Sequence, residues 1–148
     1  MPKIIVNESH FGVAQEIHLK IPELNGSPLE KTDFERRVKD ADHLVLTAKK
    51  DDRHAGYMIG YNRYGHGSMY CWMTGVVPIA RKEGVLSRMM EYLESWAKER
   101  NYTHLTVKTL NDHKSMLAYL VKNGFDVIDI DHNRDTSKIG ILMEREIR

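Results

Sequence analysis

The sequence lacks the features that mark secreted, membrane and nucleic-acid-binding proteins. A single cysteine, Cys71, excludes an intramolecular disulfide framework. No apolar run is long enough to span a bilayer, and residues 1–3 do not begin a signal peptide, so a cytoplasmic protein is expected. A net charge of +1 provides no general attraction to nucleic acid or to an anionic membrane. Any electropositive site must therefore be local.

Metal ligands and domain boundaries are also missing. The eight histidines include no i, i+4 pair on an expected helix and no cysteine partner at zinc spacing, so no metal site is expected. No repeat, low-complexity segment or linker divides the chain. With 148 residues, of which 41% are hydrophobic and 29% charged, the composition predicts a single domain over residues 1–148 with one core.

Hydrophobic periodicity and turn signals predict a mixed α/β fold. The strongest helical period lies in residues 84–100, and shorter helices are expected at residues 11–19, from a Thr32–Glu35 capping box, and after Asn111. Strand-like runs occupy residues 3–7, 43–48, 57–62, 68–77, 105–110, 126–131 and 138–146. We therefore expect a mostly antiparallel central sheet of about six or seven strands flanked by about four helices.

The segment 76–86 joins a strand-like run to the longest helix through a basic turn that contains glycine. Pro78 ends the strand because it lacks the amide donor that a ladder requires. The first amides of the following helix have no intrahelical acceptor and carry the positive end of the helix dipole. Arg81 and Lys82 add full positive charges beside them. This pattern predicts a phosphate-binding turn.

The same turn resembles a family signature. Pro78 followed by Arg81-x-x-Gly84-x-Leu86 is similar to the acyl-CoA pyrophosphate motif of the GNAT N-acetyltransferases, usually Gln/Arg-x-x-Gly-x-Gly/Ala at the start of a helix after a central strand. Leu86 departs from the motif, so either its side chain turns away from the cofactor or the phosphates are placed slightly differently.

A second segment, residues 111–125, supports this resemblance. It is similar to the family's succession of a strand, an asparagine, a short helix and Gly-Phe, here Asn111 and Gly124-Phe125. Asn111 or Asp112 is able to cap the helix, and Gly124 suits the left-handed position that ends one. The two elements extend the resemblance over about residues 40–147, and it implies a GNAT-like fold.

The resemblance implies acetyl-CoA as the acyl donor and a set of residues that bind it. The backbone amides of residues 81–87 would bind the pyrophosphate, and the backbone of the preceding strand end would bind the pantetheine arm and polarise the thioester carbonyl. Asn111 either caps its helix or contacts the cofactor. The expected cofactor-binding residues are Val76, Val77, Arg81, Lys82, Glu83, Gly84, Val85, Leu86, Ser87, Asn111 and Ser115.

The proton donor for the departing thiolate has several candidates. The family often places a tyrosine five residues before the phenylalanine of Gly-Phe, and this position is Leu120 here. Tyr119 lies one residue earlier and therefore about 100° around the helix. Tyr119 is the candidate general acid, with an aromatic packing role as its alternative. Ser115 and solvent are the other possible donors.

The sequence indicates no carboxylate base on the central strand. No Asp or Glu occurs between Arg63 and Glu83, and Trp72 lies near the position where some family members carry a carboxylate. The open alternatives are a water held by backbone carbonyls, His66, or a carboxylate of the first helices, Glu16 or Glu35. Cys71, in the middle of this strand, is interpreted as a small buried thiol and not as a nucleophile.

The predicted function is acetyl transfer from acetyl-CoA to a primary amine, directly and through a tetrahedral intermediate. The acceptor is a small molecule or an amino group of a peptide or protein, with no nucleic-acid or membrane partner. The alternative is a non-catalytic acyl-CoA-binding sensor or accessory module. The acceptor pocket is expected at the first two helices, their loop 22–32 and the last strand pair, and Glu23 and Glu30 of the loop would attract a cationic amine. By analogy, a homodimer is expected through the C-terminal strands or the helix of Tyr119.

Overall fold

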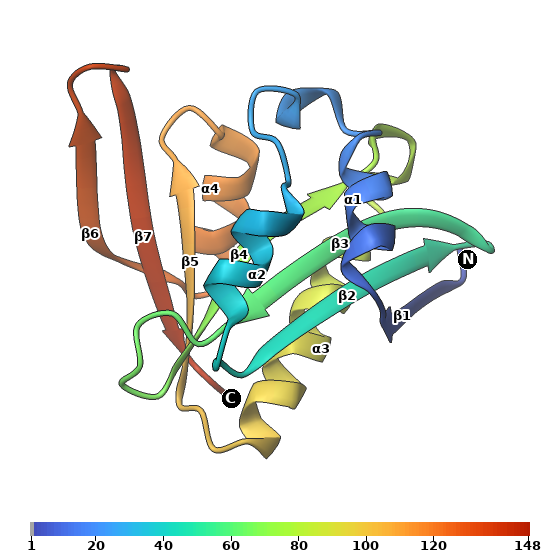
Figure 1. Ribbon diagram of the computed structural model, residues 1–148, viewed down its shortest axis with the longest axis horizontal. Coiled ribbons are helices and arrows are strands. Elements are labelled where there is room, and N and C mark those ends of the chain that lie inside the picture. Colours follow the sequence, from blue (N-terminus) through green and yellow to red (C-terminus); the bar gives the residue numbers. More distant parts are fainter. Residues whose placement is uncertain (1) are drawn as a thin grey trace.

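The computed structural model describes residues 2–148, over which it contains four α-helices and one seven-stranded sheet (Figure 1). The strands are β1 (Ile4–Glu8), β2 (His43–Lys50), β3 (Arg53–Tyr61), β4 (Ser68–Val76), β5 (His104–Leu110), β6 (Asp126–Asn133) and β7 (Lys138–Glu146). The helices are α1 (Phe11–His18), α2 (Lys31–Val38), α3 (Val85–Glu99) and α4 (Lys114–Lys122), with short 3-10 helices at η1 (Pro22–Leu24) and η2 (Pro78–Ala80). The predicted mixed α/β fold is confirmed.

The sheet has the order β1-β2-β3-β4-β5-β7-β6, and its neighbours are antiparallel except for β4 and β5. The parallel β4–β5 ladder is short, running from the pair Ser68 and His104 to the pair Cys71 and Val107. In Figure 1, β2, β3 and β4 run at an angle to β5, β7 and β6, so the two halves of the sheet diverge beyond this ladder.

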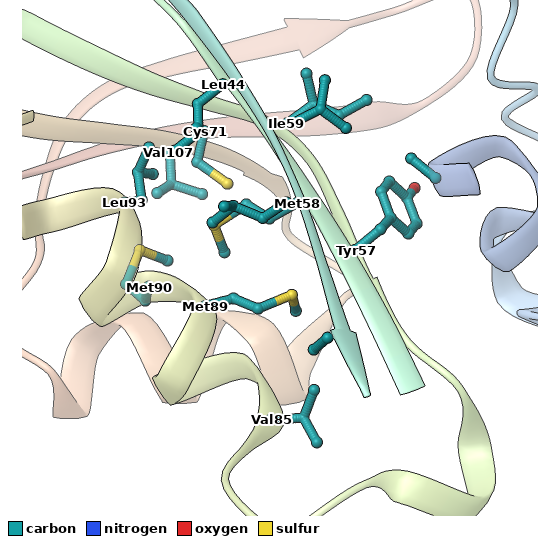
Figure 2. Close-up of a cluster of buried hydrophobic side chains, with 14 of the residues drawn as sticks. Leu44, Tyr57, Met58, Ile59, Cys71, Val85, Met89, Met90, Leu93 and Val107 are labelled. Carbon is teal, nitrogen blue, oxygen red and sulfur yellow. The ribbon is translucent and has the colours of Figure 1, made fainter. Parts of the chain in front are cut away.

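Helices cover both faces of the sheet. Helices α1 and α2 lie together on one face, where Phe11 and Phe34 stack with their ring centroids 4.5 Å apart. On the other face, Met58 of β3 and Cys71 of β4 point toward α3, whereas Tyr57 of β3 points to the α1 side (Figure 2). The apolar stripe predicted for α3 is buried against the sheet: Met89, Met90, Leu93, Trp96 and Ala97.

Two expected helix starts differ from the structure. Helix α2 begins at Lys31 after Glu30, and no side chain caps it, so the Thr32–Glu35 capping box is wrong. Helix α4 begins after His113, also without a side-chain cap. The amide of Asn111 instead donates to the carbonyl of Ile139 at 2.8 Å, next to the β5–β7 ladder. Asn111 lies in the turn after β5, two residues before the N-cap position at His113, and is therefore too early in the chain to cap α4.

The β2–β3 hairpin is tighter than the sequence suggested. Lys50 pairs with Arg53, which leaves a two-residue turn of Asp51 and Asp52 with φ angles of 50° and 68°. Positive φ at both central residues matches the twist of a two-residue hairpin, and aspartate tolerates it better than most residues. Strand β3 therefore begins at Arg53 and not at residue 57. None of the helices in residues 2–148 has the length and apolarity needed to cross a membrane.

Candidate functional site

The central feature of the site is the opening between β4 and β5. Beyond Cys71 and Val107 the two strands no longer pair, although β3 follows β4 to Val76 and β7 follows β5 to Leu110. A β-bulge at Trp72 bends β4 at the same point, since Gly60 pairs with Cys71 while the preceding Ile59 pairs with Met73. The facing edges of β4 and β5 therefore have no strand partner along the opening.

The turn after β4 presents a row of unpaired amides. Lys82 and Gly84 have φ angles of 64° and 91°, and the first i, i+4 bond of α3 runs from the Arg88 amide to the Gly84 carbonyl at 3.0 Å. Within residues 2–148, the amides of residues 82–87 donate to no backbone or side-chain acceptor. A Cβ atom at Gly84 would meet nothing within 4 Å, so the space beside the turn is open. These are the properties of an anion-binding turn.

Some backbone groups at the end of β4 already form hydrogen bonds within the protein. The Val77 amide donates to the Ala55 carbonyl at 2.8 Å, and the Val77 carbonyl accepts from the Ala80 amide at 3.0 Å. The Val76 carbonyl accepts from Nε of Arg81 at 3.1 Å. Of the two residues predicted to bind the pantetheine arm, Val77 thus has both backbone groups in hydrogen bonds within the protein.

The charges of the turn are engaged in contacts that the sequence did not reveal. Arg81 forms an ion pair with Glu23 of η1, and Glu83 forms one with Lys50 at the end of β2. Lys82 is exposed. Glu23 is therefore not a free surface carboxylate that attracts an amine, as its position in the loop had suggested. The pairs join residues far apart in the chain, so no local pattern indicates them.

The side chains of the first turn of α3 separate into two groups. Val85 is buried and Leu86 packs half-buried against the core, so the bulk of Leu86 is directed toward the protein. Ser87 is directed toward α4, and its Oγ lies 3.2 Å from the phenol oxygen of Tyr119. The structure thus brings Tyr119 to the turn predicted to bind phosphate, although Ser87 and Tyr119 are 32 positions apart.

Tyr119 and its neighbour Leu120 have different environments. Leu120 is fully buried, so no proton donor occupies the position where the family often has tyrosine. Tyr119 is half-buried, and burial raises the pKa of its phenol, an effect that the hydrogen bond with Ser87 partly opposes. Ser115 is exposed on α4, and Asn111 is half-buried at the end of β5.

The three candidate side-chain bases lie on separate elements, and all are exposed. His66 lies in the turn before β4, at the paired end of the β4–β5 ladder, with a φ angle of 55°. Glu16 is exposed on α1, and Glu35 is exposed on α2, with its carboxylate 3.9 Å from Lys31. Cys71 is 2% exposed, as expected, and burial raises its pKa to about 12.

Trp72 is in contact with helix α2, on the face of the sheet that α1 and α2 cover. The guanidinium of Arg37 in α2 lies 4.6 Å from the centroid of the indole ring. Arg37 also donates to the phenol oxygen of Tyr61 at 2.9 Å and to Asp33 at 3.1 Å. Helix α2 is thereby fixed above the residue at which β4 and β5 begin to separate.

The loop between α1 and α2, residues 19–30, covers the end of β4. A Cβ atom at Gly75 would lie 2.5 Å from Cδ1 of Ile21 and 3.1 Å from Cδ1 of Leu24. The buried His18, at the end of α1, connects strand β3 to this loop. Its Nδ1 lies 2.6 Å from the Tyr57 phenol and its Nε2 lies 2.7 Å from the Ser27 carbonyl. Because a carbonyl only accepts, Nε2 carries the proton and Nδ1 accepts from Tyr57, whose pKa is raised by burial.

Comparison with known proteins relates this geometry to a family. The model of the acetyltransferase (GNAT) family matches residues 13–125. The ribosomal-protein-S18-alanine N-acetyltransferase of Escherichia coli is similar in structure, with a TM-score of 0.81 and 14% identity, covering 98% of this chain and 94% of that one. The IAA acetyltransferase from Bacillus cereus ATCC 14579 has a TM-score of 0.79 and 16% identity, covering 97% and 99%.

A GNAT family acetyltransferase from Elizabethkingia anophelis, whose structure has acetyl-CoA bound, has a TM-score of 0.76 and 16% identity, covering 97% of each chain. A search of curated protein sequences finds no match. At such low identities the structural likeness establishes a shared fold, whereas the family model spans most of the chain.

Proposed function

Because the chain belongs to the GNAT family of acetyltransferases, we propose that it transfers an acetyl group from acetyl-CoA to a primary amine, directly and through a tetrahedral intermediate. One observation carries this proposal: the strand edges that separate beyond Cys71 lead to a turn with six unpaired amides. The match ends at residue 125 but the sheet continues to Glu146, so we propose one domain over residues 1–148.

The residues at the opening fit an acyl-CoA. The amides of residues 82–87, with Arg81 and Lys82 beside them, would hold the pyrophosphate. The unpaired edge of β4 between Trp72 and Val76 would hydrogen-bond the amides of the pantetheine arm and orient the thioester carbonyl. When bound, acetyl-CoA supplies an acyl group that is already activated as a thioester. The protein needs no nucleophile of its own, which agrees with the burial of Cys71.

The acceptor amine must lose its proton before it attacks. Strand β4 carries no carboxylate, and Trp72 stands at the bulge with its ring beneath Arg37. We therefore propose that a water held by carbonyls of the opened strand edges accepts this proton. Such a base is weak, so the reaction should favour amines that are partly neutral at the working pH.

The leaving thiolate needs a proton, and we propose Tyr119 as its donor. Burial raises the pKa of this phenol, so it remains protonated at neutral pH. The Oγ of Ser87 lies 3.2 Å from the phenol oxygen and would orient it. The proposed donor would then lie on α4, beside the proposed phosphate-binding turn at the start of α3.

Calorimetric titration of acetyl-CoA and CoA into the parent and into Gly84→Asp tests the proposal. The variant adds negative charge where the pyrophosphate should bind, and we expect it to lose most of the affinity. Gly84→Asn is the matched control because it has the same size and also has to adopt the positive φ. Its affinity should lie well above that of Gly84→Asp. Turnover is then sought with a panel of primary amines. A folded parent that binds no CoA would contradict the proposal.

A second function is favoured by two positions that lack the polar side chains the family often has there. Leu120 is buried where the family often has tyrosine, and β4 carries no carboxylate. A non-catalytic acyl-CoA-binding module would have these features. It would bind CoA with the same dependence on residue 84 but acetylate no amine.

A further inference from the structure

Arg81 and Glu23 join the two regions that serve different substrates in the proposed reaction. Arg81 belongs to the phosphate-binding turn, whereas Glu23 lies in η1 within loop 19–30, which covers β4 from the α1 and α2 side. Arg81 holds the Glu23 carboxylate with Nη2 and the Val76 carbonyl with Nε. One guanidinium thus connects the turn, the end of β4 and loop 19–30.

Loop 19–30 closes over β4 next to this contact. Ile21 is 2% exposed and, together with Leu24, leaves no space for a side chain at residue 75. The C-terminal part of the loop is attached independently of Arg81, because His18 bonds the Ser27 carbonyl and Gln15 donates to the Leu29 carbonyl at 2.9 Å. Segment 21–24 is held by the burial of Ile21, so the Glu23 side chain is the part of the loop that is able to exchange its partner.

A pyrophosphate bound at amides 82–87 would change the surroundings of both side chains. Arginine binds phosphate, like carboxylate, with two parallel hydrogen bonds, and the added negative charge of the pyrophosphate would repel the Glu23 carboxylate. The Arg81 and Glu23 side chains are 40% and 55% exposed. An ion pair this exposed contributes little and is readily exchanged.

We propose that Glu23 competes with the pyrophosphate of the cofactor for Arg81, so that cofactor binding frees the Glu23 carboxylate on the acceptor side of β4. This inference rests on the proposed function. It makes Glu23 the residue that couples the two substrate sites. By reciprocity, a cationic amine that pairs with the freed carboxylate binds more tightly once the cofactor is present.

Calorimetry on a double-mutant cycle tests the competition. We expect Glu23→Gln to bind CoA about two- to fivefold more tightly than the parent, the range set by an exposed ion pair. Glu30→Gln is the matched control, since it removes the same charge from an exposed residue of the same loop, and its affinity should equal that of the parent. In the Arg81→Gln background, Glu23→Gln should have no effect, because the competition acts through Arg81.

The outcomes separate this inference from the proposed function. A parent that fails to bind CoA overturns the proposed function. If the parent binds CoA but Glu23→Gln binds it with equal or lower affinity than the parent, only the competition is overturned. An equal gain in Glu30→Gln, or a gain that persists with Arg81→Gln, indicates a general charge effect and also overturns it.

Titration of a cationic amine with and without CoA tests the coupling. In the parent, CoA should raise the affinity for the amine about two- to fivefold, and in Glu23→Gln it should not. An amine affinity that CoA leaves unchanged in the parent would refute the coupling. Thermal unfolding of each variant verifies that the exposed substitutions leave the fold intact.

Discussion

The ion pair between Glu94 of α3 and Arg145 of β7 supports a quantitative prediction. It joins helix α3 to a strand on the other side of the β4–β5 opening. The Arg145 and Glu94 side chains are 10% and 19% exposed, and Nη2 lies 2.8 Å from Oε2, although the two atoms are not aligned as a hydrogen bond. Oε2 of Glu94 and both Nε and Nη1 of Arg145 are buried without a hydrogen-bond partner in the described residues, and the guanidinium lies 5.1 Å from the centroid of the Phe125 ring. The pair is therefore largely removed from water.

Substituting one partner leaves the other charge buried without compensation. From measurements on comparable buried pairs, we expect Glu94→Gln to lower the free energy of unfolding by about 3 kcal/mol. For a chain of this size this corresponds to a decrease in Tm of about 6–12 °C. The double variant Glu94→Leu with Arg145→Met removes both charges and should lie within about 1 kcal/mol of the parent.

Urea unfolding followed by circular dichroism measures these differences. The control is Glu35→Gln, which removes a carboxylate 3.9 Å from Lys31 in a pair whose side chains are 60% and 76% exposed. We expect that variant to lose less than about 0.5 kcal/mol. If Glu94→Gln costs no more than this control, the pair is effectively solvated and the argument from burial is refuted. If the double variant is as unstable as the single one, the loss comes from packing and not from the unpaired charge.

Further predictions concern three single side chains, Cys71, Tyr119 and Ser87. Cys71 should resist labelling by a thiol reagent at pH 8, because burial raises its pKa to about 12, and it should react fully in denaturant; rapid labelling of the native protein would contradict its burial. The same shift means that the buried thiol contributes stability that is complete below its unfolded pKa and is lost as the pH rises from about 9 to about 12, as an alkaline unfolding series would show. Tyr119→Phe should lower kcat by about 10²-fold or more if the phenol is the acid, with little change in the affinity for acetyl-CoA. Ser87→Ala should lower kcat less than Tyr119→Phe; an unchanged kcat in Tyr119→Phe with the best amine would exclude the acid role.

The features of the site that follow from local chemistry could be predicted from the sequence. The apolar period of α3 identifies its buried face, because residues three and four apart share one side of a helix. Pro78 and Gly84 determine where β4 ends and where α3 begins, since one lacks an amide donor and the other adopts a positive φ without strain. The unpaired amides of the turn follow from these two boundaries alone.

Other expectations failed because a distant partner decided the local structure. Asn111 has the chemistry of a helix cap, but its amide extends the bonding to β7 at Ile139, and α4 begins later. Glu23 looks like a free carboxylate in a polar loop, but it forms an ion pair with Arg81. In both cases the competing contact joins residues more than 25 positions apart, where the sequence contains no periodic signal.

The sequence by itself determined the turn with unpaired amides, the buried face of α3 and the mixed α/β class, because each depends on backbone preferences and side-chain spacing within about one turn of helix or a few strand residues. The tertiary structure decided where β4 and β5 separate, which side chains engage Arg81, and that Tyr119 meets Ser87. These features depend on strand register and on the packing of α3 beside α4. Register and packing are properties of the whole chain, since they come from the burial of many distant residues at once.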